Sequence, residues 1–233
     1  MARPSPIRAD GDGALRAAIV AAGRRLGARG LISAGEGNVS ARLDDGNILI
    51  TPSGRRKDEL GPADLLVVPM HPPAAGDARS GAAGAARPSS DIAIHRAVYE
   101  TRQDVAAVVH AHLPAAMALT LAGEVPDPTS LPETALLLPR LPYVPFGTPG
   151  SAELAARIGV AFAEGPEPLP GAVLLERHGA VAAGASVDQA VDRLELVEVL
   201  CRTWRDALLI RAAVAVGAGG AILRPPSQSR RDR

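Results

Sequence analysis

The chain has 233 residues and a formal net charge of zero, with 25 basic and 25 acidic side chains. This length fits one domain with a full hydrophobic core, so we interpret residues 1–233 as a single domain. The balanced charge provides no electrostatic attraction for nucleic acid or for an anionic membrane, and we expect neither as a partner. Because only 2% of the residues are aromatic, few side chains can stack on bases or sugar rings, which favours a polar site.

The cysteine content and the two ends of the chain bear on its location. The single cysteine, Cys201, cannot form an internal disulfide, and its helical pattern is typical of a small buried side chain. Residues 1–13 lack the apolar core of a signal peptide, and the uncharged run 212–223 is too short and too glycine-rich to span a bilayer. We therefore expect a cytoplasmic protein with no membrane segment.

Hydrophobic periodicity and turn residues predict the first elements. Apolar side chains in residues 13–29 recur at helical spacing and stop at Gly30, which predicts an amphipathic helix. Residues 39–43 and 47–51 flank an Asp-Asp-Gly-Asn turn and predict a β-hairpin. Residues 65–69 predict a further short strand. An antiparallel sheet therefore begins here.

Three segments have the composition of loops or tails. Residues 72–88 are rich in Ala, Gly and Pro, which indicates a surface loop. We also expect residues 1–12 and 217–233 to be flexible tails.

The rest of the chain mixes helices with more strands than a simple β-α-β alternation provides. Ser90 and Asp91 can cap the first of these helices. The predicted helices cover 91–102, 113–122, 151–163 and 186–214, and the predicted strands cover 104–109, 143–146, 172–175 and 180–183. We therefore predict an α/β fold in which helices flank a central, mainly antiparallel sheet.

Three histidines point to a metal site. His110 and His112 are two positions apart on a strand, so they lie on the same face about 7 Å apart. His178 ends a second apolar strand. Three imidazoles plus an open position form the ligand set of a catalytic zinc site, although each histidine alone is also compatible with a strand end. His71 and His95 are better interpreted as solvated or packed side chains.

Three turns are candidates for binding an anion. Residues 35–38 place two glycines and an asparagine before a strand, where backbone N–H groups can form a nest. Residues 51–54 follow a strand with two hydroxyls, and residues 89–91 offer hydroxyls at the start of a helix, where the dipole favours anions. Each of these motifs alone is also compatible with a plain turn or cap. Their occurrence together with the three histidines favours a phosphate site.

Taken in order, these motifs resemble a known family. Residues 37–54, 88–91, 108–112 and 174–184 resemble the class II aldolase/adducin family, and most closely its L-fuculose phosphate aldolase-like members. The resemblance extends over residues 15–207. Each motif is weak alone, whereas the ordered set is highly specific.

The resemblance implies a three-layer α/β/α fold around an antiparallel sheet and a cyclic homotetramer with sites between neighbouring subunits. It implies a zinc ion held by His110, His112 and His178, and Mn²⁺ or Co²⁺ would suit the same ligands. The family's phosphate pocket corresponds to Asn38, Ser53, Gly54, Ser89 and Ser90.

The resemblance also implies a reaction. We expect a zinc-dependent aldolase that cleaves a ketose 1-phosphate of the L-fuculose type to dihydroxyacetone phosphate and an aldehyde. Zinc acts as a Lewis acid in such a reaction and stabilises the enediolate. Asp91 occupies the position of the aldolases' glutamate, where it is either a general base or a metal ligand.

Two departures from the family pattern leave alternatives open. Aldolases supply a tyrosine from a neighbouring subunit, but residues 126–134 contain none and offer Glu133 instead. Tyr143 lies in a predicted strand and is interpreted as structural. A sugar-phosphate 4-epimerase needs a second acid/base, yet the tail after Leu209 contains no tyrosine or histidine. Epimerase and decarboxylase chemistry remain alternatives, as does a non-catalytic adducin-like interaction module, which the presence of all three histidines disfavours.

Overall fold

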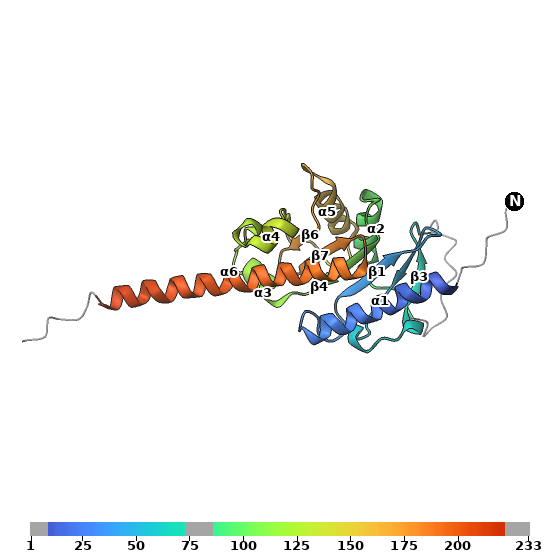
Figure 1. The fold of residues 1–233 in the computed structure, drawn as a ribbon, viewed down its shortest axis with the longest axis horizontal. Helices are drawn as coiled ribbons and strands as arrows, with labels where there is room; N and C mark the ends of the chain where they lie inside the picture. Colours follow the sequence, from blue (N-terminus) through green and yellow to red (C-terminus); the bar gives the residue numbers. More distant parts are fainter. Residues whose placement is uncertain (1–8, 73–85, 222–233) are drawn as a thin grey trace, which may run out of the picture.

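A computed structural model describes residues 9–72 and 86–221 as a seven-stranded sheet between two layers of helices (Figure 1). The strand order is β3-β2-β1-β4-β7-β6-β5. The strands are β1 (Asn38–Arg42), β2 (Asn47–Ile50), β3 (Leu66–Pro69), β4 (Ala107–Ala111), β5 (Tyr143–Val144), β6 (Ala172–Leu175) and β7 (Gly179–Gly184). Neighbouring strands are antiparallel except β5 and β6, so the predicted mainly antiparallel sheet is confirmed.

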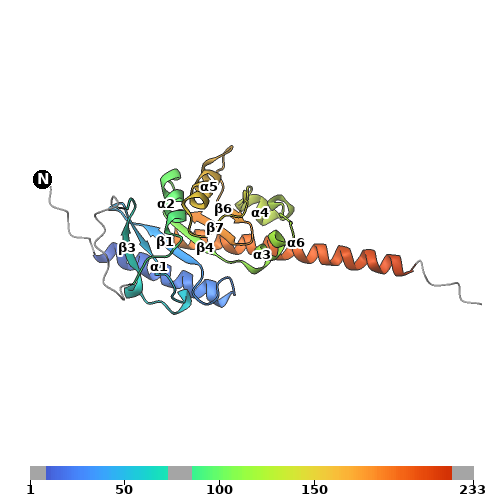
Figure 2. The same ribbon diagram turned by 180° about the vertical axis from the view of Figure 1, so that it is seen from behind.

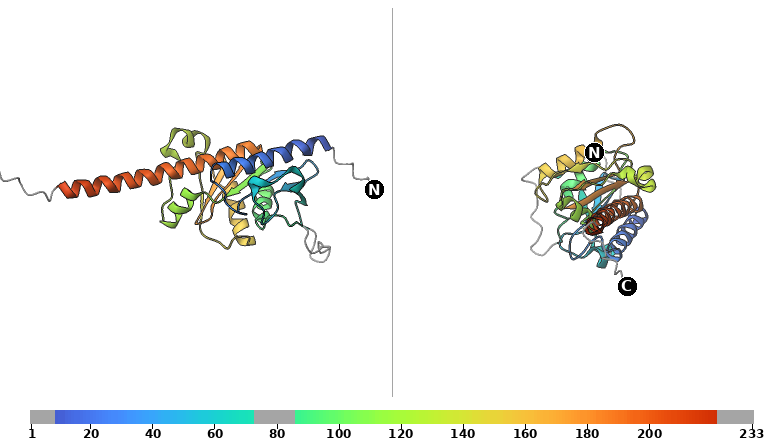
Figure 3. Two further views of the ribbon diagram at one scale, coloured as in Figure 1. Left: turned by 90° about the horizontal axis from the view of Figure 1, so that it is seen from below. Right: turned by 90° about the vertical axis from the view of Figure 1, so that its left-hand side faces the viewer.

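The helices form one layer on each face of the sheet. They are α1 (Ala9–Ala28), α2 (Ile92–Thr101), α3 (Pro114–Leu121), α4 (Pro132–Leu137), α5 (Ala152–Ala163) and α6 (Val187–Ala221). The helices α1 and α6 lie side by side on one face, and α2 and α5 pack together on the other (Figures 1 and 3). Each face has its own apolar cluster, because side chains alternate between the faces along each strand. The three-layer α/β/α fold is therefore confirmed.

The strand register determines which side chains meet at the site. Strand β1 pairs with β4 so that Asn38 lies opposite His110, and β4 pairs with β7 so that Ala111 lies opposite Ala180. Side chains of Ile48, Val108 and Val181 belong to the cluster under α2 and α5. Because alternate residues share a face, Asn38 and His110 project toward the same layer.

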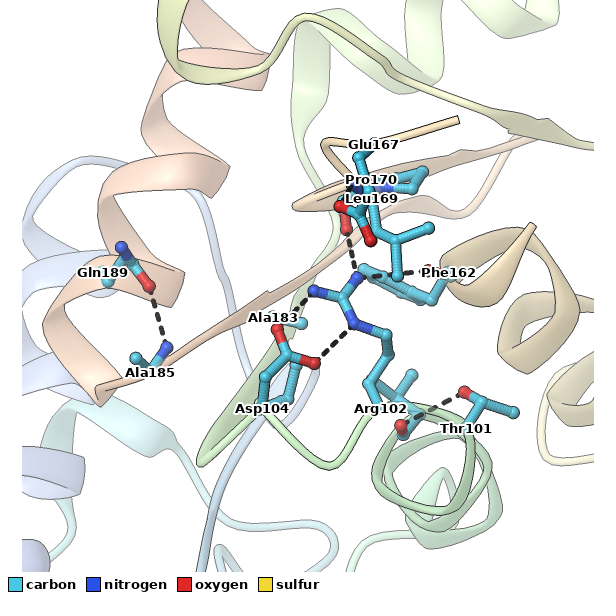
Figure 4. Close-up of polar contacts among 12 residues, drawn as sticks. Thr101, Arg102, Asp104, Phe162, Glu167, Leu169, Pro170, Ala183, Ala185 and Gln189 are labelled. Atoms are coloured by element: carbon cyan, nitrogen blue, oxygen red, sulfur yellow. Dashed lines mark hydrogen bonds and ion pairs between the residues drawn. The ribbon is translucent and has the colours of Figure 1, made fainter. Parts of the chain in front are cut away.

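Arg102, directly after α2, ties that helix to its neighbours. Its guanidinium donates to the carbonyl oxygens of Phe162 and Pro170, each at 3.1 Å, and to both carboxylate oxygens of Asp104 at 2.8 and 2.6 Å (Figure 4). The side chain is 9% exposed. Charge-assisted, two-pronged contacts of this kind hold a buried arginine in one geometry, so the position of α2 against α5 is well defined.

The ends of the helices differ from the sequence prediction. Helix α1 begins at Ala9, inside the segment predicted as an N-terminal tail, and α6 continues to Ala221, beyond the predicted tail start at residue 217. At the N-terminal end, Asp12 forms an ion pair with Arg16 one turn further on, which stabilises the first turns of α1. Residues 1–8, 73–85 and 222–233 lie outside the described residues, and so do most of the loop and tail predictions. The far half of α6 projects past the rest of the fold (Figure 2).

Two helices begin with a side-chain cap. The Ser151 side chain accepts from the Leu154 N–H, and the Ser186 side chain accepts from the Gln189 N–H. Asp91 stands at the N-cap position of α2, but its side chain makes no capping hydrogen bond, so the capping prediction is wrong there. Strand β4 begins at Ala107, three residues later than predicted, and contains His110. Among the described helices, none is long and apolar enough to cross a bilayer.

Candidate metal centre

The three histidines predicted as ligands converge at one point beside β4. The ring centroids of His110, His112 and His178 are 4.7 to 5.0 Å apart, and the rings are inclined to one another by 62° to 63°. One ring nitrogen from each residue lies within 4.8 Å of the others. This nearly threefold arrangement points three donor atoms at a common centre, as one face of a tetrahedral site requires.

The protonation of His110 leaves a lone pair toward that centre. Its Nδ1 lies 3.0 Å from the carbonyl oxygen of Ala180. Because a carbonyl only accepts, Nδ1 carries the proton and Nε2 carries the lone pair. Nε2 is buried and has no hydrogen-bond partner. Burial, and then the neighbouring imidazoles of His178 and His112, hold the pKa of His110 well below its usual range. The residue is therefore a neutral donor.

His178 is presented by the tight turn between β6 and β7. Arg177 adopts a left-handed conformation with φ of 56°, and Gly179 has φ of 86°. A side chain at position 179 would overlap the carbonyl oxygen of Ala111, so only glycine allows the turn to approach β4 this closely. The Nδ1 of His178 is buried and has no partner. Burial lowers its pKa below the usual value, more than the nearby Asp91 carboxylate raises it.

His112 follows β4 directly and is oriented by a carboxylate. Its Nδ1 lies 3.3 Å from Oε2 of Glu36. The other carboxylate oxygen, Oε1, accepts from the backbone N–H and the hydroxyl of Ser33, each at 2.8 Å. A carboxylate that accepts from the far nitrogen of a ligating histidine sets its tautomer and ring orientation. Glu36 therefore suits an orienting role, which the sequence interpretation as part of an anion nest did not include.

The donor set fits a divalent zinc ion. Buried imidazole nitrogens without protein partners are costly, and a metal ion satisfies them. Three imidazole nitrogen donors suit zinc, and they leave a fourth position for substrate or water. The geometry brings together the three residues that the sequence predicts, and their role as ligands stays a prediction.

Asp91 lies beside the metal centre at the start of α2. It is 8% exposed, and its Oδ2 accepts from the Asn38 side-chain amide at 2.9 Å. Its charge acts on the imidazole of His178, which lies nearby. The carboxylate is therefore held by a side chain of β1, and its Oδ1 is free of the helix backbone.

The three candidate anion turns come together next to Asp91. The turn at Gly35 packs directly on Gly54, where an added Cβ would lie 3.2 Å from the Gly54 carbonyl carbon. The segment containing Ser53 pairs with the one before Ser89 through a bridge between Pro52 and Pro88. Sequence reasoning places phosphate-binding residues on all three turns. Their adjacency is now established, and the role of Asn38, Ser53, Gly54, Ser89 and Ser90 stays a prediction.

Lys57 is a buried cation that joins these turns. Its Nζ donates to the carbonyl oxygen of Gly35 at 2.5 Å and to that of Arg55 at 2.8 Å. The side chain is 2% exposed, and in the described residues it has no carboxylate within ion-pair distance. Burial lowers its pKa, and the charges of Asp91 and Glu36 raise it again. Nothing in its local sequence, Arg-Arg-Lys-Asp-Glu, distinguishes this lysine from a solvated one.

The remaining two histidines behave as predicted. His71 is solvent-exposed, with 79% of its side chain accessible. His95 is fully buried within α2, and burial lowers its pKa to about 3. Neither belongs to the metal centre.

Comparison with known proteins agrees with this geometry. Residues 17–205 match the family model described as the class II aldolase and adducin N-terminal domain. The chain belongs to the class II aldolase/adducin family. It is 36% identical over 194 residues to a 3-oxo-tetronate 4-phosphate decarboxylase of Cupriavidus necator, covering 82% of this chain and 83% of that protein.

Two further relatives carry different activities. A methylthioribulose-1-phosphate dehydratase of Acidiphilium cryptum is 36% identical over 197 residues, covering 78% of this chain and 85% of the relative. The solved L-fuculose-1-phosphate aldolase of Thermus thermophilus superposes with a TM-score of 0.72 at 30% identity, covering 86% and 97% of the two chains. The chain thus stands among the enzymes of this superfamily, and its similarity is not specific to fuculose phosphate aldolases.

Proposed function

We propose that the protein is a metal-dependent lyase that releases carbon dioxide from a small phosphorylated 3-oxo acid. The observation that carries this proposal is the meeting of three imidazoles, one carboxylate and three donor-rich turns at one place. A divalent ion held by His110, His112 and His178 would act as a Lewis acid toward a substrate carbonyl oxygen. The turns would bind the phosphate.

The bond changes explain why decarboxylation and aldol cleavage share a site. In 3-oxo-tetronate 4-phosphate the bond between C1 and C2 breaks, and its electron pair forms an enediolate across C2 and C3. In a ketose 1-phosphate the bond between C3 and C4 breaks and leaves the same three-carbon enediolate. Protonation of either fragment gives dihydroxyacetone phosphate. Asp91, beside the metal centre, is the group placed to carry that proton.

The two tyrosines favour decarboxylation over aldol cleavage. Aldol cleavage must also remove a proton from the hydroxyl group on the departing carbon, whereas a substrate carboxylate has already lost its proton. Tyr99 is fully buried. Partial burial and the nearby Glu176 raise the pKa of Tyr143, which lies on the edge strand β5. Neither phenol is a ready partner for that second proton transfer.

Aldol cleavage of a ketose 1-phosphate is the second candidate. Its support is the structural similarity to the Thermus thermophilus L-fuculose-1-phosphate aldolase and the shared enediolate. In this candidate, Glu133 would take the role of the tyrosine that aldolases supply from a neighbouring subunit. Glu133 lies in the first turn of α4.

We further propose zinc as the metal and a ring of four subunits as the assembly. The far half of α6 carries exposed apolar side chains, including Leu209, Ile210 and Val214 at 62% to 65% exposure. Apolar surface of this kind is typical of an interface. Light scattering should give a mass about four times 23.8 kDa. A fully active monomer would overturn the assembly proposal.

A product screen tests the reaction. Zinc-loaded protein is incubated separately with 3-oxo-tetronate 4-phosphate, L-fuculose 1-phosphate and methylthioribulose 1-phosphate, and carbon dioxide, dihydroxyacetone phosphate and aldehyde are measured. We expect carbon dioxide and dihydroxyacetone phosphate in equal amounts from the first substrate, with the highest kcat/KM. Aldehyde from a ketose phosphate alone would establish the second candidate, and a dehydrated product alone would exclude both.

A further inference from the structure

Five polar side chains, most of them buried deep between β1 and α2, form one unbranched hydrogen-bonded chain. The Tyr99 hydroxyl lies 2.8 Å from the Ser40 hydroxyl, which lies 2.6 Å from Nδ1 of His95. Nε2 of His95 lies 2.5 Å from the side-chain oxygen of Asn38, whose Nδ2 lies 2.9 Å from Oδ2 of Asp91. All five side chains are 8% exposed or less. This series of hydrogen bonds therefore links the buried Tyr99 to the Asp91 carboxylate beside the candidate metal centre.

The end at Asp91 determines the direction of every bond. A carboxylate only accepts, so the Asn38 amide nitrogen faces it and the amide oxygen faces His95. That oxygen also only accepts, so Nε2 of His95 carries the proton. Because full burial keeps the ring neutral, Nδ1 carries the lone pair. Ser40 must then donate to Nδ1 and accept from Tyr99. One proton arrangement satisfies all four contacts.

We propose that His95 is a positioning residue for Asp91, acting through Asn38. By holding the amide oxygen of Asn38, it keeps an N–H group on Oδ2 of the carboxylate and leaves Oδ1 for the reacting carbon. This inference rests on the proposed function, in which Asp91 carries the proton. It also limits Asn38 to one remaining N–H for a substrate phosphate.

A neutral imidazole suits this position because it bears a donor and an acceptor on opposite edges of a rigid ring. A hydroxyl or an aliphatic side chain cannot bridge Ser40 and Asn38 in that way. The rigid setting of α2, fixed at its far end by Arg102, keeps the ring in place. Full burial also keeps the ring neutral, so that it does not lose its acceptor.

The tautomer of His95 is the direct test and does not depend on activity. Nitrogen-15 NMR of zinc-loaded protein distinguishes protonated from unprotonated ring nitrogens. We expect a protonated Nε2 and an unprotonated Nδ1 from pH 6 to pH 9. The opposite tautomer, or a doubly protonated ring, would overturn the inference even if the protein turns over its substrate.

Kinetics test the positioning role with a conservative pair of variants. His95→Met should lower kcat by about 10- to 100-fold, the usual effect of losing a residue that orients an active group, and should change KM by less than about threefold. His95→Gln keeps a donor and an acceptor, so its kcat should lie between those of His95→Met and the wild type. On a logarithmic scale, it should recover at least about a third of the difference. Zinc content should stay at the wild-type level in both. If His95→Met does not fold, Ser40→Ala provides the same test with almost no change in volume.

Phe162→Leu is the matched control, because Phe162 lies on α5 in the same apolar cluster and forms no hydrogen bond with any of the five side chains. If all variants lose activity in proportion to stability, His95 has only a structural role and the inference fails. A rise in KM alone would mean that Asn38 serves the phosphate and not Asp91, which also overturns it. Should wild-type protein act on no tested substrate, the proposed function fails while the tautomer still decides this inference.

Discussion

His95 and the three histidines of the candidate metal centre lie in the same layer of this protein, and the partners of their ring nitrogens differ. In the chain from Tyr99 to Asp91, both ring nitrogens of His95 have protein partners. At the metal centre, Nε2 of His110 and Nδ1 of His178 are buried without any. Burial alone therefore does not identify a ligand site. Two unpaired nitrogens that point at one centre favour a ligand site, because buried polar groups in folded proteins are normally paired.

This difference in pairing indicates different roles for His95 and for the histidines of the candidate metal centre. We propose that the three histidines of the candidate centre hold a metal ion, and that His95, whose ring nitrogens are both paired, orients the carboxylate of Asp91 through Asn38. Each of the following predictions tests one side of this division, beginning with the largest expected effect.

Removing a ligand should abolish both metal binding and activity. We expect His110→Ala to reduce zinc content far below one ion per subunit and to lower kcat/KM at least about 10³-fold, because a Lewis acid contributes several kcal/mol to catalysis. The lost contact to Ala180 should cost about 1 kcal/mol of stability. Metal analysis and urea unfolding measure these effects.

His71→Ala is the control, since its side chain is 79% exposed and lies outside the centre. It should keep both zinc and rate. Normal zinc content in His110→Ala would contradict the proposed ligand role of His110 and with it the difference from His95.

Changing Asp91 should affect the rate and not the metal. We expect Asp91→Asn to keep zinc, because three histidines suffice, and to lower kcat by about 10²- to 10⁴-fold, the usual contribution of a positioned proton transfer. The Asn38 amide can still donate to the new amide oxygen, so stability should survive. Steady-state kinetics and chelator titration measure the two effects separately.

The same change at Asp188, an exposed residue in the first turn of α6, should leave kcat unaltered. Weaker metal binding in Asp91→Asn would make the carboxylate a ligand. An unimpaired kcat would remove it from the chemistry.

Lys57 also has a buried polar group: its ammonium donates to two backbone carbonyl oxygens, and among the described residues no carboxylate lies within ion-pair distance. We expect Lys57→Met to raise KM for the phosphorylated substrate about 10-fold, equivalent to about 1.4 kcal/mol of binding. The change removes a positive charge and the link between two of the anion turns. KM for the unphosphorylated analogue should not change, and an equal rise for both would exclude a phosphate role.

The buried, neutral imidazole of His95 should make the protein less stable as the pH falls. Its pKa in the folded protein is about 3, whereas an unfolded histidine takes up a proton below about 6.5. The unfolded state thus binds more protons between these values, and stability falls as the pH falls. His95 should contribute about 2 kcal/mol of this loss between pH 6.5 and pH 5. Urea unfolding at both pH values should show that His95→Gln loses less unfolding free energy than the wild type as the pH falls. An equal loss in both proteins would contradict a buried, neutral His95.

The sequence predicted the strands of the sheet and the convergence of the three histidines because both signals are local. Alternation and turn residues mark β1 and β2, and the two-residue spacing of His110 and His112 places them on one face. The third histidine could be added because it too follows an apolar strand. The extent of α6 was underestimated. The glycines near its end predicted a helix end, whereas the helix continues to Ala221.

The partners of these residues could not be predicted from the sequence. Asn38 and Asp91 are 53 positions apart, and Ser40 and His95 are 55 apart, so their contacts depend on how α2 packs over β1. Lys57 has the local sequence of a surface lysine, yet it is buried by the turn at Gly35. Side-chain pairing across such separations follows from tertiary packing and has no periodic signal.

The position of His178 also has a consequence for the order in which the protein assembles. His110 and His112 are neighbours along the chain, so they can contact an ion before any sheet exists. His178 reaches that ion only after β7 has paired with β4 and Gly179 has come against Ala111. If the three histidines hold an ion, full coordination requires that β4 and β7 have paired, and the ion would stabilise the folded chain over forms in which only two histidines reach it. Refolding in the presence of a chelator should consequently yield a sheet in which the β4–β7 pair opens more often than in the metal-loaded protein.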